Sequence, residues 1–181
     1  MPDPILELLI VGTRHRIYYL CEGNHRSFRD FADDLHASGP FAARLRRKPK
    51  VESKKTLPPD WKKLLALLQR AAQHGIEVVA QNSARCKRFV PPPAHTNNER
   101  MEVCEFKTGP YRVLFFVEET TRPEPRTTLI ITHVFEKKQD ETPRGELRRF
   151  ADLRATYYRW RAALKARDAL DAITKCQPPT S

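Results

Sequence analysis

The sequence predicts an α+β fold, with a small, mainly antiparallel twisted sheet, a helical pair before it and a long helix after it. Short runs of β-branched and aromatic residues recur between residues 101 and 136, separated by glycine- or proline-containing segments. Two earlier segments and one later, longer segment have apolar residues at helical spacing. Because the strand runs follow one another closely, hairpins are the simplest way to connect them.

The first elements are a hairpin and a short helix. Leu6 to Val11 and Arg16 to Cys21 are apolar runs on either side of Gly12-Thr13-Arg14-His15, which predicts two paired strands. Ser27-Phe28-Arg29-Asp30 resembles a capping box, and apolar residues at helical spacing follow it as far as Gly39-Pro40. This pattern predicts the first helix of the pair.

A basic, proline-interrupted segment separates this helix from the next. Residues 46–55 carry six lysines and arginines and cannot bury themselves, so we expect a loop there. Pro58-Pro59-Asp60 then begins a second helix that Gly75 is placed to end. The apolar residues on one face of this helix, which we expect to pack on the sheet, are Trp61, Leu64, Leu65, Leu68 and Ala72.

The segment before the central hairpin is less regular. Ile76 to Ala80 is either a strand or an extended exit from the helix, because its apolar run is short and polar residues follow at once. Cys86 to Val90 fits a strand at a sheet edge that the three prolines at 91–93 end. Residues 95–100 are then predicted to form a polar loop.

A three-stranded meander follows. Val103 to Phe106 and Tyr111 to Val117 flank Thr108-Gly109-Pro110 and predict a hairpin. Thr127 to Phe135 is the third strand, and the prolines before it cannot continue a ladder because they lack the N–H donor. Thr142-Pro143 then begins a helix in the expected way.

The last helix has an apolar seam on a basic background. Tyr158 lies off the seam and is the better candidate to contact a base or a partner protein, whereas residues 177–181 are predicted to form a frayed tail. The seam residues, which either join the core or form a partner interface, are Phe150, Leu153, Tyr157, Trp160 and Leu164.

The 181 residues are enough for one domain spanning 1–181, with an extended N-terminal half. A formal charge of +11 indicates either a polyanionic partner or a solvated basic surface. No apolar run approaches the roughly 20 residues of a membrane span, and the start lacks a basic secretory signal, so we expect a cytoplasmic protein. Four cysteines without CxxC spacing predict free thiols, with no zinc site and no disulfide framework.

Arg112 stands out chemically because it lies in a strand otherwise composed of apolar residues, where an arginine is costly unless an anion meets it. Two partners are equally plausible: a phosphate of a bound nucleic acid, or Glu105 on the neighbouring strand. Cutting RNA without a metal requires that a 2′-OH be deprotonated and that charge on the phosphorane be stabilised, and arginine and lysine suit the second task.

Lys137 and Lys138 end the third strand, and their alternation means that only one of them projects to the face of Arg112. His133 titrates near neutral pH and is a candidate acid or base, with a satisfied, half-buried histidine as the alternative. Arg112, Lys137, Lys138 and His133 are therefore the candidate catalytic residues. The sequence does not identify a general base.

Four motifs resemble, in order and spacing, the phage-derived, HigB-like branch of the RelE/ParE toxin superfamily: Cys104-Glu105-Phe106-Lys107, Tyr111 to Phe116, Thr132 to Lys138, and Thr142-Pro143. The match is ungapped from Thr132 to Pro143 and covers the C-terminal half better than the first hundred residues. The resemblance implies a RelE-like fold and the toxin of a type II toxin–antitoxin pair. Such a toxin is usually an endoribonuclease that cuts messenger RNA on the ribosome without a metal or other cofactor.

The same resemblance implies a helix-turn-helix antitoxin as protein partner. It also implies that the loop before the central hairpin borders the RNA-binding face, which adds Lys87, Arg88 and His95 as RNA-binding candidates beside Lys107 and Tyr158. Lys107 replaces the arginine usually found two residues after the strand glutamate, the N-terminal half is longer than usual, and so is the last helix. Two other functions therefore stay open: a non-catalytic basic module that binds RNA or protein, and a toxin that targets DNA gyrase.

Overall fold

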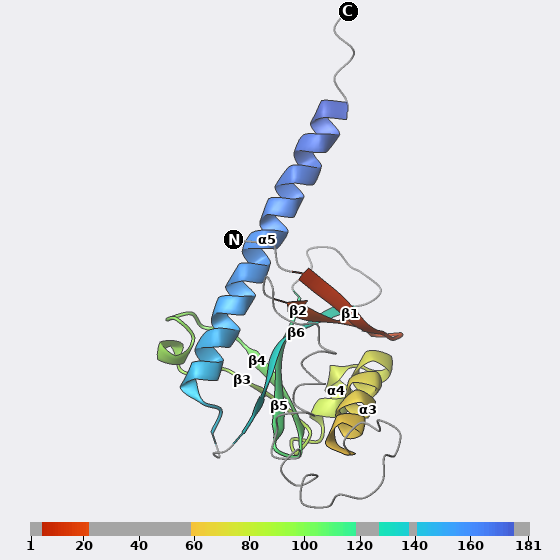
Figure 1. Cartoon of the computed structure of the whole chain (residues 1–181), viewed down its shortest axis with the longest axis vertical. Helices are drawn as coiled ribbons and strands as arrows, with labels where there is room; N and C mark the ends of the chain where they lie inside the picture. Colours follow the sequence, from red (N-terminus) through yellow and green to blue (C-terminus); the bar gives the residue numbers. More distant parts are fainter. Residues whose placement is uncertain (1–4, 22–58, 119–126, 138–140, 176–181) are drawn as a thin grey trace, which may run out of the picture.

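In a computed structural model of the chain, residues 5–21, 59–118, 127–137 and 141–175 are described. They form a six-stranded mixed sheet whose strands lie in the order β1-β2-β6-β5-β4-β3 (Figure 1). All neighbouring strands are antiparallel except β2 and β6, which are parallel. The strands are β1 (Ile5–Val11), β2 (His15–Cys21), β3 (Cys86–Phe89), β4 (Val103–Thr108), β5 (Tyr111–Val117) and β6 (Thr127–Glu136).

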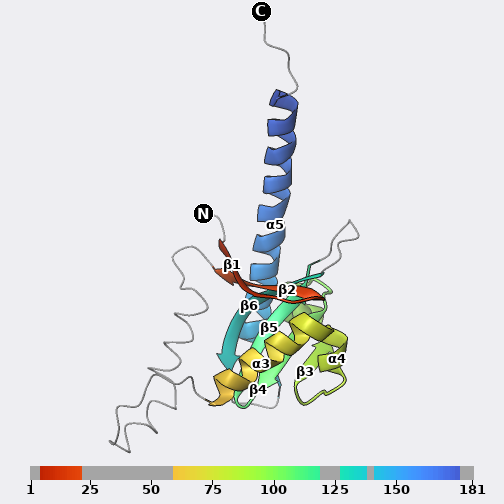
Figure 2. The same ribbon diagram turned by 90° about the vertical axis from the view of Figure 1, so that its right-hand side faces the viewer.

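One face of the sheet is covered by α3 (Pro59–His74) and the short α4 (Ile76–Ala80), as Figure 2 shows. The predicted apolar stripe of α3 is confirmed at Leu64, Leu68 and Ala72, which are at most 1% exposed, whereas Leu65 is half-buried and the side chain of Trp61 lies outside the described part. The turn between β1 and β2 presses against the end of this helix. A Cβ at Gly12 would lie 2.1 Å from the carbonyl oxygen of Ala72, so only glycine permits this approach.

The other face is covered by α5 (Arg144–Lys175), which runs past the sheet and away from it (Figure 1). The first part of the predicted seam is core, since Phe150, Leu153 and Tyr157 are at most 1% exposed and pack on β5 and β6. Trp160 and Leu164 are only partly buried. The seam therefore holds the N-terminal half of α5 to the sheet and loosens further along.

The predicted α+β class, the 103–136 meander and the edge strand at 86–89 are confirmed. The expectation of a small, mainly antiparallel sheet in the RelE style is not met in detail. The N-terminal hairpin joins the sheet through the parallel pairing of His15–Tyr19 with Thr127–Ile131. That pairing links residues more than a hundred positions apart, and no local pattern signals it.

Ile76–Ala80 is a helix, so both alternatives considered for it, a strand and an extended exit, are wrong. Gly75 ends α3 with φ 97°, as expected of a glycine after a helix, and the chain then re-enters helical geometry. The helix expected after Ser27 and the basic loop at 46–55 lie outside the described residues.

Cys86 and Cys104 are buried free thiols on the α3 face, and burial raises the pKa of each, to about 11 and about 12. The side chains of Cys21 and Cys176 lie outside the described part. None of the helices within the described residues combines the length and apolar character needed to cross a bilayer.

Candidate functional site

The central strands bring Glu105, Arg112 and His133 together beneath the N-terminus of α5. Glu105 on β4 lies opposite Leu114 on β5, and Leu114 lies opposite His133 on β6, so Glu105 and His133 stand in one row across the sheet. In the next row, Arg112 lies between Lys107 and Phe135. Leu114 and Phe135 belong to the core under α5, which places the polar residues of these rows on that face.

Arg112 forms an ion pair with Glu105, with 3.3 Å between its Nε and Glu105 Oε1. Its Nη1 also donates to the backbone carbonyls of Gly109 and Tyr111, both at 2.8 Å. The carboxylate is only 1% exposed, and its Oε2 accepts a hydrogen bond from Thr142 Oγ1 at 2.8 Å. Of the two partners considered for Arg112, the structure therefore contains Glu105, while 17% of the arginine side chain remains exposed.

His133 is also held internally. Its Nε2 lies 3.1 Å from Oε2 of Glu146 in the first turn of α5, and its Nδ1 lies 3.1 Å from Thr132 Oγ1. The single hydroxyl hydrogen of Thr132 is used by the carbonyl of Leu114, so Nδ1 must donate to Oγ1. The Glu146 carboxylate faces Nε2, so the ring lies between a hydroxyl on β6 and an acid on α5.

His133 also affects the ionisation of its partner Glu146. A hydrogen bond from His133 lowers the pKa of Glu146, although partial burial opposes this shift. With His133 only 2% exposed, its ring joins β6 to α5 and does not face solvent. The geometry gives it a structural role, and its predicted acid–base role stays a prediction.

Lysines border the pair of Arg112 and Glu105. Lys107 lies directly across from Arg112, and its Nζ donates to the Ser83 carbonyl at 2.8 Å. Burial is the main cause that lowers the pKa of Lys107, and the positive charges of Lys87, Arg112 and Lys137 add to it. Lys107, Arg112 and Lys137 thus form a basic cluster at one end of the central strands. The side chain of Lys138 lies outside the described residues.

The other RNA-binding candidates are spread over the molecule. Arg88 on β3 is engaged by Glu102, at 2.8 Å, and by Glu77, at 3.6 Å, and the hydrogen bond to Glu102 is the main cause that raises its pKa. The ammonium of neighbouring Lys87 lies 4.6 Å from the ring centre of Phe89. The charge of Arg88 is therefore largely compensated within the protein.

His95 ends a short 3₁₀ turn, Pro93–His95, and is partly buried. Tyr158 packs with Phe116 at a ring distance of 5.8 Å, and the guanidinium of Arg154 lies 5.0 Å from the centre of its ring. Tyr158 is therefore part of the packing beneath α5. Neither residue belongs to the basic cluster.

Sequence reasoning missed the partners that complete the face beneath α5. Glu146 and Thr142 bind His133 and Glu105, and Glu118 binds both the hydroxyl of Tyr157, at 2.6 Å, and Arg161, at 3.0 Å. One sequence feature could have indicated the contact between His133 and Glu146. Glu146 is an acid in the first turn of the helix that follows the strand carrying the histidine. This feature was not specific, because acids are common at that position for local reasons.

The arrangement can do two things chemically. The buried pairs fix the start of α5 on the sheet and hold Arg112 in one orientation. The basic cluster of Lys107, Arg112 and Lys137 offers positive charge at the strand ends, where an anionic group can approach from solvent. Among the described residues we identify no side chain placed to act as the general base.

Comparison with known proteins yields one finding. The family model described as phage derived protein Gp49-like (DUF891) matches residues 55–154, which is more than half of the chain. The matched region runs from the approach to α3 through the first part of α5 and contains the basic cluster. No curated protein and no solved structure matches the chain.

Proposed function

Because the chain belongs to the phage-derived Gp49-like family, a type II toxin family of RelE/HigB-like proteins, we propose that it is an endoribonuclease toxin that cleaves messenger RNA on the ribosome. The observation that carries this proposal is the family match over residues 55–154. The chain's charge of +11 supports RNA as the target. The proposal places the protein in the cytoplasm, where a helix-turn-helix antitoxin neutralises it.

The proposed chemistry is metal-independent cleavage through attack of a ribose 2′-OH on the adjacent phosphate. Arg112, with Lys137 and Lys138, stabilises the charge that develops on the phosphorane. The pair with Glu105 orients the guanidinium of Arg112 before substrate arrives, which reduces the reorganisation needed during reaction. His133 is the candidate proton donor to the leaving 5′-oxygen, and this role requires the Glu146 contact to open.

One observation favours a second candidate function. Arg112 and His133 are both engaged with carboxylates of the same protein. A non-catalytic basic module that binds RNA through its surface needs neither residue free. The two candidates differ in how they respond to single substitutions.

The deciding experiment is induced expression of the chain and its variants, with growth measured and cleavage of a reporter message mapped by primer extension. A nuclease loses about 10²–10³ in cleavage rate when Arg112 or Lys138 becomes alanine, because these side chains meet charge that grows in the transition state. Lys62→Ala is the matched control, an exposed lysine on α3 outside the candidate site.

Circular dichroism of each purified variant establishes that it is folded. A folded wild type that arrests no growth and cuts no message in the presence of ribosomes contradicts the nuclease proposal. Cleavage that persists in all the variants would instead move the catalytic assignment away from Arg112 and Lys138.

A further inference from the structure

Two adjoining hollows lie on the α3 side of the sheet, and we call them together the α3 groove. The first has a volume of about 430 Å³ and lies between α3 and the end of β4, and the second, of about 300 Å³, lies between α3 and α4. Both are lined by Leu67, Arg70 and Arg85, so they share a wall. Lys63, Lys107 and Thr108 complete the first hollow.

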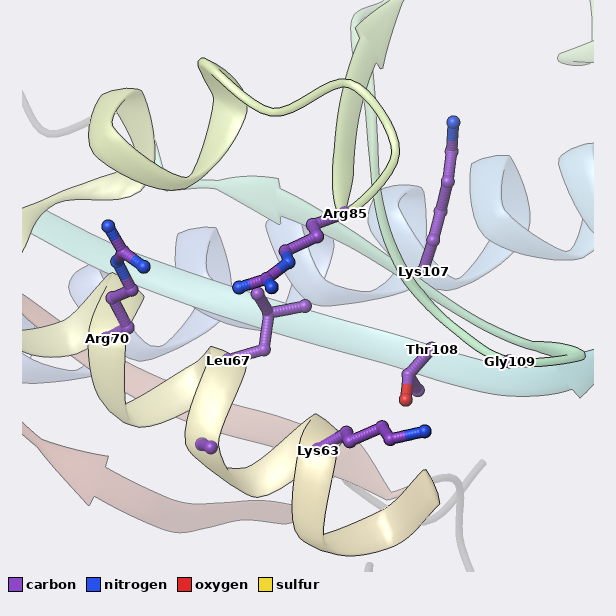
Figure 3. A pocket seen from close by; sticks show the side chains of 8 residues that line it. Lys63, Leu67, Arg70, Arg85, Lys107, Thr108 and Gly109 are labelled. Carbon is purple, nitrogen blue, oxygen red and sulfur yellow. The ribbon is translucent and has the colours of Figure 1, made fainter. Parts of the chain in front are cut away.

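All the charged side chains that line the groove are basic. Figure 3 shows Arg85 extending over Leu67 towards the side of α3 that carries Arg70. Lys63 lies on the same helix, one turn before Leu67. None of the residues that line the two hollows, all within the described part of the chain, carries a carboxylate. Like charges gathered in one place repel one another, so an anion bound between Arg70 and Arg85 would relieve this repulsion.

A third hollow shows the contrast. It lies beside the end of α3, and Arg14 and Arg88 line it together with Glu77. Glu77 is 3.6 Å from Arg88, which already has Glu102 as a closer partner. The third hollow thus contains an acid that pairs with one of its arginines, whereas no acid lines the α3 groove.

The lining also indicates which kind of anion fits. An acidic peptide normally adds large apolar anchors, and the apolar side chains that line the groove are either small, as at Ala66, or largely buried, as at Leu67 and Val79. Arginine forks match phosphate oxygens, the Thr108 hydroxyl is a further polar group, and Gly109 has no side chain to block a backbone from approaching. The lining contains no aromatic ring on which a base would stack, so contacts go to the phosphates.

We propose that the α3 groove binds the phosphodiester backbone of single-stranded RNA through Arg70, Arg85 and Lys63. The choice of RNA rests on the proposed function. The inference goes beyond it by placing a substrate contact on the face of the sheet opposite α5. Lys107 lines the groove and also lies across from Arg112, so a strand in the groove leads towards the basic cluster.

The test measures binding of a fluorescent, 2′-O-methylated single-stranded RNA by anisotropy, because this probe cannot be cleaved through its 2′-oxygen. Arg70→Glu/Arg85→Glu is compared with Lys62→Glu/Arg148→Glu, which makes the same change in net charge at exposed positions outside the groove. We expect the groove variant to bind at least about 10-fold more weakly and the control to lose less than about 3-fold. Equal losses in the two double variants would overturn the proposal.

Two further arms keep the result unambiguous. If the Glu variant fails to fold by circular dichroism, Arg70→Gln/Arg85→Gln replaces it, with Lys62→Gln/Arg148→Gln as the control of equal charge change. A polyglutamate peptide is added as competitor, and displacement of RNA by it at equal charge concentration would overturn the assignment of the groove to RNA. Because the probe reports binding without cleavage, a wild type that binds through the groove but cuts no message defeats only the nuclease proposal.

Discussion

Charged residues on the two faces of the sheet differ in whether they have partners of opposite charge within the protein. Beneath α5, Arg112, His133 and Arg161 each lie within 3.3 Å of a carboxylate oxygen of the same protein. On the α3 side, the sheet carries an apolar core, and basic residues such as Arg70 and Arg85 lie at its rim in a groove lined by no acid. These three groups beneath α5 thus have acidic partners within the protein, whereas Arg70 and Arg85 on the α3 side are exposed to solvent.

This difference shows where charge is available for a ligand. Arg112 is conspicuous in the sequence because its strand is apolar, but an arginine in such surroundings needs a partner within the fold. Arg70 and Arg85 are inconspicuous, one on the exposed side of a helix and the other in a turn. Within the described part of the chain no salt bridge involves either arginine, so both charges are available to a ligand.

The largest expected effect on stability separates the core of the α5 face from its edge. Phe150→Ala should reduce the free energy of unfolding by about 3–5 kcal/mol, because Phe150 is fully buried and packs edge-on against Phe116. Trp160→Ala should cost less than half as much, since Trp160 is only partly buried. Urea denaturation monitored by circular dichroism measures both, and equal losses would mean that α5 packs uniformly along this stretch.

A smaller effect on stability is expected when one arginine from each face is replaced by alanine. Arg112→Ala leaves the Glu105 carboxylate buried without its ion-pair partner, with the hydrogen bond from Thr142 retained, and we expect a loss of about 3 kcal/mol in the free energy of unfolding. Arg70→Ala should change it by less than about 0.5 kcal/mol, because the side chain is exposed. The same denaturation experiment checks the pair, and similar values for both would remove the distinction between the faces.

The smallest effect concerns pH. The pKa of Glu146 in the folded protein lies below its ordinary value of 4.5, so the ionised carboxylate stabilises the fold above that value. This contribution disappears as pH falls through the lowered pKa, because the carboxyl is then protonated in both states. The stability advantage of the wild type over Glu146→Gln should therefore shrink between about pH 5 and pH 3. Glu141→Gln, at an exposed position, controls for the change in charge, and an advantage independent of pH would contradict the ion pair.

Much of the α5 face could be predicted from the sequence because its signals are local. The strands of the meander, the edge strand before the prolines and the buried seam at Phe150, Leu153 and Tyr157 follow from periodicity and turn residues. Glu105 was one of two partners considered for Arg112, because the hairpin places their strands side by side.

The remaining features depend on contacts between distant segments. The parallel pairing of β2 with β6 and the contact of His133 with Glu146 require the assembled fold. The groove joins Arg70 on α3 to Arg85 in a turn and Lys107 on β4, three residues with no common sequence pattern. Ile76–Ala80 is too short for its apolar residues to distinguish a helix from a strand.

The central claim is that RNA in its ground state is held by the α3 groove, whereas the charges beneath α5 are engaged within the protein. The most direct measurement is the salt dependence of binding to the 2′-O-methylated single-stranded RNA, for the wild type, Arg70→Glu/Arg85→Glu and Arg112→Ala. Each lost phosphate contact reduces the slope of log affinity against log salt by about 0.7. We predict a reduction of about 1.4 for the groove variant and an unchanged slope for Arg112→Ala. A reduced slope for Arg112→Ala together with a wild-type slope for the groove variant would contradict the claim.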